Sequence, residues 1–361
     1  MPRTRVGIVG CGKIAQNHAR ALAAIDVVEI SACSDVDLGR ARSFADQFEI
    51  GQAFATLSEL LDSGVDIVTV CTPHPSHEAV VVAAAQRGVH VLCEKPIAIT
   101  MAEAGRMIEA TEQAGVKFGV LFQRRFWPAA QRLKEAVAGG GIGTPVFASA
   151  TVRLGRDRAY FDADPWRGTW SAEGGGVLIN QAIHYIDLMQ WFVGSPIVEV
   201  GGTISTLVHG DYIDVEDTAV ATVRFANGAL GTISAGTTFV PGLGNQVLVS
   251  GSTGATVSVT EYPEGTAGIS DIWTLSGQEA YLPPLSTDVD ADPPLAQIHQ
   301  NLTPFHALQI ADFVHAVIED REPLVTGAQA CQALEVVLAI YESSRTGTRV
   351  TLATGAEPVP A

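Results

Sequence analysis

The chain has 361 residues, more than one hydrophobic core usually organises, so two domains are expected. Its 39 acidic residues outnumber 22 basic ones and give a formal net charge of -17, which disfavours nucleic acid as a partner. No apolar run approaches membrane-spanning length and no secretory leader precedes the first strand, so we expect a soluble, cytoplasmic protein without a membrane partner.

The first 122 residues alternate short apolar runs with helical patterns, which is typical of a parallel sheet covered by helices. Two capping boxes, Thr56 with Glu59 and Thr100 with Glu103, mark helix starts. We therefore predict an α/β domain over residues 1–123. Its expected strands are RVGIVG (5–10), VVEISACS (27–34), VDIVTVC (65–71), GVHVLCE (88–94) and VKFGVLF (116–122).

The sequence GCGKIA, residues 10–15, follows the first expected strand and opens the first expected helix. It fits the G-x-G-x-x-G/A dinucleotide fingerprint, in which Gly10 allows a tight turn and Gly12 lets the backbone approach a pyrophosphate. Ala15 permits close helix packing, and the helix N-terminus supplies partial positive charge. The strand-turn-helix context predicts a dinucleotide-binding Rossmann domain.

Asp35 stands 23 residues after Gly12, at the end of the second expected strand. A carboxylate there can accept hydrogen bonds from ribose hydroxyls and repels a 2'-phosphate. This favours NAD over NADP as the cofactor, although Arg40 nearby weakens the preference.

The stretch HVLCEKPIAIT, residues 90–100, places an ionisable pair between two apolar runs and follows it with Pro96. A charge beside a buried strand is costly unless it is paired, so Glu94 and Lys95 are expected to leave the sheet at its edge and to face a cleft. An ordinary strand-end turn with solvated charges is the alternative.

Residues 71–77, CTPHPSH, offer Cys71, His74 and His77 at spacings that suggest zinc. No second ligand cluster accompanies them, and they lie where a strand passes into its crossover helix. We therefore expect no metal site.

After Phe122 the pattern changes to Val- and Thr-rich segments separated by turns, which indicates a mainly antiparallel sheet. We predict an α+β domain over 124–352, built on an open sheet, whose C-terminal helices can pack back on the first domain. Residues 353–361 are expected to form a tail. The expected elements are a helix at 128–138, strands within 146–154, 218–225, 230–239 and 246–259, and helices at 305–320 and 328–344.

Residues 174–194 predict a helix that is apolar almost all round and therefore buried. Asn180, His184 and Asp187 interrupt it at spacings that place them on one face. We expect this stripe to line a reactive site, with Asp187 holding the His184 imidazole in one tautomer.

The glycine turn, the CEKP sequence and GGGVLINQAIHYIDL resemble the glucose-fructose oxidoreductase, inositol dehydrogenase and rhizopine-catabolism (Gfo/Idh/MocA) family. The stretches FHALQIADFVHAVIEDREPLV and AIYESSRTGTRV are similar to the C-terminal region of that family. Each motif is modest alone, but their order and spacing together are specific.

The resemblance implies a Rossmann domain joined to an open, mainly antiparallel sheet that packs in dimers or tetramers. It also implies hydride transfer between NAD(H) and a carbinol carbon of a sugar, sugar derivative or cyclitol, with Lys95 and His184 as the catalytic pair. His184 would accept the hydroxyl proton and Lys95 would stabilise negative charge on oxygen, or the two roles would be exchanged.

Two groups of residues are expected to contact the ligands. Trp166 and Arg167, in the segment WRGTW, resemble the part of relatives that closes over substrate, and His306 is a weaker candidate. The expected cofactor contacts are Gly10, Gly12, Lys13, Ile14, Asp35, Thr72, Pro73, His77, Glu94, Lys95 and Gln123. The expected substrate contacts are Asn180, Asp187, Trp166, Arg167, Tyr160 and Arg125.

One position departs from the family pattern, because many members carry aspartate where this chain has Asn180. An amide cannot act as a base, but it can donate and accept hydrogen bonds to a sugar hydroxyl. A keto-sugar reductase of nucleotide-sugar or antibiotic-sugar synthesis therefore stays open, as does a non-catalytic NAD-binding regulator on the same fold. A glycosidase that uses transient NAD redox chemistry is a further alternative.

Overall fold

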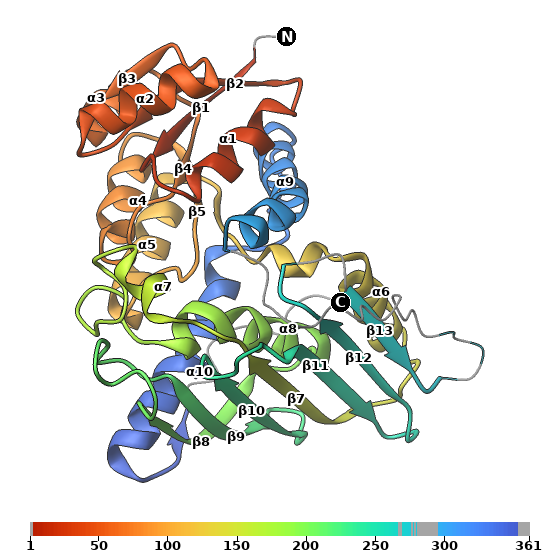
Figure 1. Ribbon diagram of the computed structural model, residues 1–361. Coiled ribbons are helices and arrows are strands. Elements are labelled where there is room, and N and C mark those ends of the chain that lie inside the picture. The colour runs from red at the N-terminus through yellow and green to blue at the C-terminus, as the bar shows by residue number, and fades with distance from the viewer. Residues whose placement is uncertain (1–2, 266–268, 276, 278, 280–294, 353–361) are drawn as a thin grey trace. The chain divides into compact units, whose positions relative to one another are not determined.

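The computed structural model describes residues 3–265, 269–275, 277, 279 and 295–352 (Figure 1). The chain divides into two compact units, Met1–Gln123 with Leu302–Cys331, and Arg124–Asn301 with Gln332–Ala361. Residues 302–331, from the C-terminal helical part of the predicted second domain that can pack back on the first, belong to the first unit. The expected tail at 353–361 lies outside the described residues. Within the described part, no helix combines the length and the apolar character needed to span a membrane.

The first unit is built on a six-stranded parallel sheet in the order β3-β2-β1-β4-β5-β6, as the sequence pattern predicts for a Rossmann domain. The edge strand β3 was not predicted, because three residues without an apolar run give no strand signal. Both capping boxes are present, at Thr56 and at Thr100. The strands are β1 (Thr4–Val9), β2 (Val28–Ser34), β3 (Gln52–Phe54), β4 (Ile67–Val70), β5 (His90–Cys93) and β6 (Phe118–Val120). The helices between them are α1 (Ala15–Ala23), α2 (Leu38–Phe48), α3 (Leu57–Asp62), α4 (His77–Ala85) and α5 (Met101–Ala114).

A late segment of the chain completes the first unit beside β6. Helix α9 (Leu295–Ile318) brings the buried side chain of Phe313 onto Gly119, where a Cβ atom would lie only 2.7 Å from the Phe313 ring. In the same helix, the side-chain amide of Gln309 donates to the carbonyl of Val120 at 2.8 Å. Helix α9 therefore covers the last strand of the parallel sheet, and Gly119 is the small residue that lets it approach.

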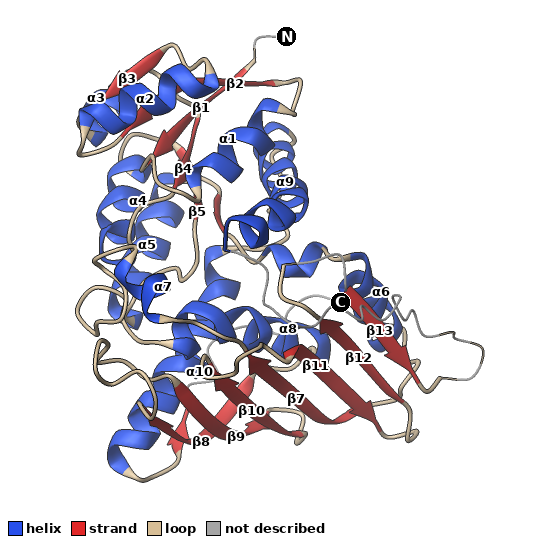
Figure 2. Cartoon of the chain, in the orientation of Figure 1, coloured by secondary structure: helices blue, strands red, loops and turns tan. Residues whose placement is uncertain are grey.

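The second unit holds an eight-stranded sheet in the order β13-β12-β11-β7-β10-β9-β8-β14. Its strand pairs are antiparallel except for β7 with β10, so the expected mainly antiparallel sheet is confirmed. Helix α8 (Ile183–Val193) packs on β7 and β11 (Figure 2). The strands are β7 (Pro145–Arg153), β8 (Ile197–Ser205), β9 (Thr218–Phe225), β10 (Leu230–Gly236), β11 (Gly244–Gly251), β12 (Thr256–Glu261), β13 (Ile269–Trp273) and β14 (Val350–Thr351). The other helices are α6 (Pro128–Ala138), α7 (Arg158–Asp162) and α10 (Gly327–Thr346).

The helix expected over 174–194 has two parts. Residues Leu178–Ala182 form a π-helical turn, and α8 continues as a regular α-helix. π-Turns have wider spacing than α-helix and recur at functional sites. Asn180 therefore does not share a regular α-helical face with His184 and Asp187, contrary to the sequence expectation.

Glu216 holds the start of this helical segment. Its buried carboxylate accepts hydrogen bonds from the backbone N–H of Gly176 at 2.8 Å, from that of Leu178 at 2.9 Å, and from the Tyr341 hydroxyl at 2.9 Å. A Cβ atom at Gly176 would collide with the backbone of Glu216, so only glycine permits this approach. Burial raises the pKa of Glu216 to about 7, although the Leu178 and Gly176 N–H groups and the Tyr341 hydroxyl oppose the rise.

We expect Phe313→Ala to lower the free energy of unfolding by about 3–5 kcal/mol, because it empties a filled position against the parallel sheet. Leu308→Ala, at a half-exposed position of the same helix, is the matched control and should change that free energy by less than about 0.5 kcal/mol. Urea unfolding followed by circular dichroism measures both. Equal effects of the two substitutions would show that α9 is not part of the first core.

The Glu216 carboxyl makes the stability depend on pH. Because its pKa rises from an ordinary 4.5 to about 7, its contribution is complete below about pH 4.5 and is lost as the pH rises through 7. We expect the unfolding free energy of the native chain, relative to Glu216→Gln, to fall by roughly 3 kcal/mol between pH 4.5 and 8. Thermal unfolding of both proteins across this range tests it, and parallel curves would contradict it.

Candidate active site

In the first unit, the expected cofactor residues collect at the carboxyl ends of parallel strands. The glycine turn follows β1, Asp35 follows β2, Thr72 lies just beyond β4, and Lys95 lies just beyond β5. Ligands of open α/β sheets bind at this edge. The backbone topology thus brings together residues that lie far apart in the sequence.

The glycine turn has the geometry that a pyrophosphate needs. Gly10 has φ +88, and a Cβ atom there would meet the carbonyl oxygen of Cys71 at 2.8 Å. A Cβ atom at Gly12 would project into open space, with no atom within 4 Å. Helix α1 has Ile14 as its N-cap and no side-chain cap hydrogen bond, so its first N–H groups remain available to an anion. These features fit a dinucleotide, with exposed Lys13 beside the same turn.

Asp35 is fixed by the backbone at the end of β2. Its Oδ2 accepts a hydrogen bond from the N–H of Cys11 at 3.0 Å, and its Oδ1 accepts from the N–H of Asp37 at 2.9 Å. The exposed guanidinium of Arg40 lies 3.4 Å from the same carboxylate. Asp35 therefore has the position expected for ribose recognition, with a neighbouring cation that reduces its repulsion of phosphate.

Two polar atoms near this edge have no partner among the described residues, Oγ1 of Thr72 and Oε1 of the buried Gln123. Buried polar atoms in folded proteins are normally hydrogen-bonded, so a ligand that satisfies these two fits the site. Pro73 follows Thr72 at the surface.

The ring of His77, one of the expected cofactor contacts, is held between two turns. Its ring is fully buried, and its two nitrogens lie 2.9 Å from the Thr72 carbonyl and 3.0 Å from the Pro96 carbonyl. Burial lowers the pKa of His77. The imidazole thus links the turn after β4 to the turn after β5, because both of its nitrogens are occupied by the backbone. In the part of the chain that the structure describes, no three His, Cys, Asp or Glu side chains are grouped to hold a metal ion.

The E-K-P turn follows β5, and the peptide bond between Lys95 and Pro96 is cis. The sequence suggested that Glu94 and Lys95 both face a cleft, but Glu94 is buried. Its carboxylate is buried, accepts from the backbone N–H of Lys95 at 3.2 Å, and lies 3.0 Å from the ring of His18. Glu94 therefore acts through the protein, whereas Lys95 is half-buried.

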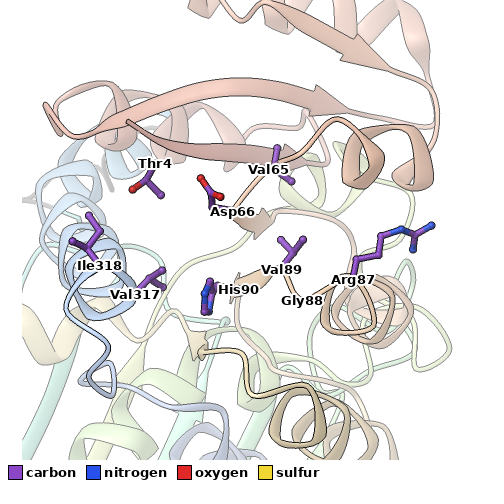
Figure 3. Close-up of a pocket in the computed structure, with 9 residues that line it drawn as sticks. All are labelled: Thr4, Val65, Asp66, Arg87, Gly88, Val89, His90, Val317 and Ile318. Carbon is purple, nitrogen blue, oxygen red and sulfur yellow. The ribbon is translucent and has the colours of Figure 1, made fainter. Parts of the chain in front are cut away.

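A cavity of about 300 Å³ also lies in the first unit, but at the amino ends of the strands, opposite the ends that carry the glycine turn (Figure 3). Thr4, Asp66 and His90, at the amino ends of β1, β4 and β5, line it. Since the glycine turn and Lys95 lie at the carboxyl ends, this cavity is not the cofactor site.

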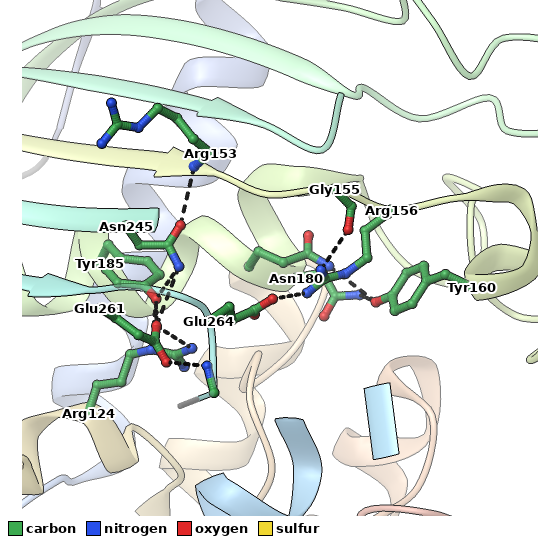
Figure 4. Close-up of polar contacts among 12 residues, drawn as sticks. Arg124, Arg153, Gly155, Arg156, Tyr160, Asn180, Tyr185, Asn245, Glu261 and Glu264 are labelled. Carbon is green, nitrogen blue, oxygen red and sulfur yellow. Dashed lines mark hydrogen bonds and ion pairs between the residues drawn. The ribbon is translucent and has the colours of Figure 1, made fainter. Parts of the chain in front are cut away.

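In the second unit, two of the expected substrate residues, Arg167 and Asn180, donate to the hydroxyl of a third, Tyr160 (Figure 4 shows the Tyr160 and Asn180 side chains). Its oxygen accepts hydrogen bonds from Arg167 at 2.5 Å, from Gln181 at 3.1 Å and from Asn180 at 3.3 Å. The Arg167 guanidinium also lies 4.6 Å from the ring centroids of Tyr160 and Trp166. Tyr160, Trp166, Arg167 and Asn180 thus form one polar and aromatic cluster, which suits a polyhydroxylated ligand.

Glu173 belongs to the same cluster, although the sequence interpretation omitted it. Its buried carboxylate accepts from the Asn180 amide and from the backbone N–H of Gly168. A carboxylate only accepts when ionised, so it fixes the Asn180 amide with its nitrogen facing Glu173. The one sequence signal for this residue is its position directly before the glycine run at 174–176.

Asp187 contacts Arg125 and not His184. The Arg125 guanidinium donates to both carboxylate oxygens, at 2.8 and 2.6 Å, and both side chains are buried. Burial raises the pKa of Asp187, and Arg125 opposes that rise. The expected tautomer-setting role of Asp187 is therefore wrong, because its oxygens are engaged in a two-point pair that is stronger than a single hydrogen bond. Arg125 is likewise a buried partner of Asp187 and not an open substrate donor.

The residue after His184 anchors helix α8 to the sheet. The Tyr185 hydroxyl accepts from Arg124 at 3.1 Å and from Asn245 at 2.8 Å, and it donates to Glu261 (Figure 4). These partners come from outside the helix, with Asn245 on β11 and Glu261 on β12. Because His184 directly precedes Tyr185, this buried network fixes the backbone that carries the imidazole.

Two family models match consecutive parts of the chain. Residues 4–122 match an oxidoreductase family with an NAD-binding Rossmann fold, and residues 130–257 match the GFO/IDH/MocA C-terminal domain. The first match includes the glycine turn and Lys95, and the second includes Asn180 and His184.

Individual relatives span most of the chain. The myo-inositol 2-dehydrogenase of Thermotoga maritima is 36% identical over 254 residues, which cover 69% of this chain and 73% of that protein. The D-apiose dehydrogenase of Paraburkholderia graminis is 27% identical, covering 97% of this chain and 90% of that protein. The crystal structure of the WlbA dehydrogenase from Bordetella pertussis, in complex with NADH and UDP-GlcNAcA, has a TM-score of 0.82 and 30% identity, covering 97% of this chain and 99% of that one. The chain therefore belongs to the Gfo/Idh/MocA family of oxidoreductases, with an NAD-binding Rossmann domain and the C-terminal domain of that family.

Proposed function

We propose that this protein is an NAD-dependent dehydrogenase that transfers a hydride between NAD(H) and a carbinol carbon of a sugar, sugar derivative or cyclitol. The observation that carries the proposal is the position of Lys95, immediately after β5 at the sheet edge that also bears the glycine turn and Asp35. A cation at that edge lies where a nicotinamide cofactor of a Rossmann domain is expected. Membership of the family supports the same reaction class.

Bound NAD would supply the hydride acceptor for the carbinol carbon. The residues of the chain supply proton transfer and charge stabilisation. We assign His184 to accept the hydroxyl proton, and Lys95 to stabilise the negative charge that develops on the oxygen. Tyr185 and Glu94, each adjacent to one of these residues, hold the backbone in place.

The substrate is proposed to contact the cluster of Tyr160, Trp166, Arg167 and Asn180. The hydroxyl, guanidinium and amide groups can exchange hydrogen bonds with several hydroxyls of one ring, and the indole can cover an apolar ring face. The curated relatives include dehydrogenases named for myo-inositol and for D-apiose, which are polyhydroxylated compounds of this kind.

NAD is proposed as the preferred cofactor over NADP. The Asp35 carboxylate is buried and held by two backbone N–H groups, so it cannot easily move away from a 2'-phosphate. Arg40 is exposed and already faces Asp35, which limits the repulsion without removing it.

A reductase acting on a nucleotide-linked or keto-sugar is the second candidate. The likeness to the WlbA dehydrogenase, whose structure holds NADH and UDP-GlcNAcA, favours it. The two candidates share the hydride chemistry and differ in the substrate. A non-catalytic NAD-binding regulator is disfavoured, because a regulator has no need of both Lys95 and His184.

A panel of sugars, inositols, keto-sugars and nucleotide sugars, assayed with NAD and NADP, tests the function. We expect turnover of at least one polyol, with a higher kcat/KM for NAD. Lys95→Ala and His184→Ala should each lower kcat by at least about 100-fold, because each removes a group that acts in the transition state. NADH fluorescence should show that cofactor binding survives in both variants.

Lys117→Ala and His315→Gln serve as controls, since both residues lie outside the proposed site and should leave kcat within about two-fold. Hydride transfer near the native rate in Lys95→Ala and His184→Ala would remove both residues from the mechanism. Equal or better turnover with NADP would overturn the cofactor assignment.

We further propose that the protein forms a dimer or tetramer through the second sheet. Strand β9 alternates buried and exposed residues, and Val220 is 56% exposed on the outward face. A groove of about 580 Å³ on this unit is lined by parts of β8, β9 and β10 and by residues 343, 344 and 347–349. A sheet face with apolar and Thr side chains suits an isologous contact with a second copy.

Light scattering after gel filtration measures this assembly. We expect the native protein to elute as a dimer or tetramer, and Val220→Glu to shift it to the monomer because a buried, unpaired charge is costly at an interface. Leu324→Glu, at an equally exposed position of the first unit, is the control and should not change the mass. A monomeric native protein would refute the proposal.

A further inference from the structure

Three ionisable side chains are buried together behind the E-K-P turn of the first unit. Glu94 directly follows β5, His18 lies on α1, and His306 lies on α9. The Glu94 carboxylate oxygen Oε1 is 3.0 Å from Nε2 of His18 and 3.8 Å from Nε2 of His306. The two imidazole rings have their centroids 6.2 Å apart. One carboxylate is thus shared between two histidines from different helices.

The burial of this cluster is nearly complete, with exposed fractions of 0% for His18, 2% for His306 and 7% for Glu94. An ionised carboxylate at such a position costs several kcal/mol unless a cation compensates it. Burial alone raises the pKa of Glu94, but His18 and His306 overcome this effect and bring the pKa down to about 2. Burial lowers the pKa of His18, whereas Cys71 and Glu94 raise it to about 10. The 3.0 Å separation of His18 Nε2 and Glu94 Oε1, in a fully buried setting, is the geometry of an imidazolium-carboxylate pair.

Lys95 is coupled to this pair in two ways. The second oxygen of Glu94 accepts the backbone N–H of Lys95 at 3.2 Å, so the direction of the carboxylate fixes where residue 95 leaves the strand. The charge of Lys95 also contributes to lowering the pKa of Glu94, which places the two charges within electrostatic reach. Cys71 acts on His18, and His306 and Lys95 act on Glu94, whereas Glu94 in turn acts on His77 and Cys93.

We propose that His18 is a positioning residue for Lys95, and that as an imidazolium it orients the Glu94 carboxylate and cancels its charge. With His18 charged, the pair is neutral and Lys95 is held through its backbone. Without that charge, the uncompensated carboxylate attracts the Lys95 ammonium and stabilises it against deprotonation. The inference rests on the proposed function only for the statement that Lys95 acts on substrate.

The composition of the chain permits a direct measurement, because Lys95 is one of only four lysines. Reductive methylation with ¹³C-formaldehyde labels these amines, and Lys95→Arg identifies the Lys95 signal in a two-dimensional NMR spectrum. We expect the pKa of Lys95 in His18→Gln to exceed the native value by about one unit or more. The glutamine keeps a hydrogen-bond donor near Glu94 and removes the charge.

Two further variants separate charge from packing. His315→Gln replaces a half-exposed histidine of the same helix as His306 and should leave the pKa of Lys95 unchanged. The double variant of His18→Gln with Glu94→Gln removes both charges, and it should return the pKa of Lys95 to within about 0.3 unit of the native value. A Lys95 pKa that is unchanged in His18→Gln, or that stays raised in the double variant, would overturn the proposal.

Histidine ¹⁵N chemical shifts are measured on the native protein, so this test does not depend on whether a His18 variant folds. We expect one buried imidazole to remain doubly protonated at pH 8, and a neutral His18 at that pH would refute the inference. Neither NMR measurement requires turnover, so its outcome stands apart from that of the substrate panel. If the panel succeeds, the pH profile of kcat in His18→Gln should shift in the same direction as the pKa of Lys95.

Discussion

The carboxyl ends of parallel strands all lie on the same side of their sheet. In the first unit, the glycine turn, Asp35 and Lys95 lie at these carboxyl ends. The grouping depends on the order and register of β2, β1, β4 and β5, and the hydrogen bond from the Cys11 N–H to Asp35 joins the glycine turn to the second of these features. Backbone hydrogen bonds then refine each position: Asp35 receives two N–H donors, and Glu94 receives the N–H of Lys95. The sheet therefore supplies the location, and buried carboxylates supply the orientation.

In the second unit, a buried helical segment carries the candidate site residues. The segment from 174 to 194 is apolar on nearly all sides and is buried, so each polar residue on it needs a partner from elsewhere in the unit. Asn180 has Glu173 and Tyr160, Tyr185 has Glu261, and Asp187 has Arg125. Glu216 satisfies the N–H groups at the start of the segment, where a helix leaves donors without intrahelical partners. The helix is thus held along its length by polar contacts as well as by packing.

Local patterns in the sequence were sufficient for the strands of the first sheet, for the capping boxes at Thr56 and Thr100, and for the glycine turn. Each of these has a signal within a few residues. The edge strand β3 has no such signal, and neither has the π-turn before α8. The pairing of Asp187 with His184 was inferred from helical spacing, but the true partner Arg125 is 62 residues away in the sequence. His18 and Glu94 are 76 residues apart, and Gly176 and Glu216 are 40 apart. No periodicity connects such pairs, so only the folded chain reveals them.

In both units the candidate reactive residue directly adjoins a buried anchor. Lys95 follows Glu94, which is held by His18, and His184 precedes Tyr185, which is held by Arg124, Asn245 and Glu261. An apolar anchor would bury surface as effectively, but dispersion contacts have little directionality and allow a neighbouring backbone to rotate. A hydrogen-bonded or charged anchor loses several kcal/mol when it moves away from its partners, because its desolvation is then uncompensated. Placing the polar anchor one residue away fixes the backbone of the proposed reactive group without engaging the side chain of that group in the anchor.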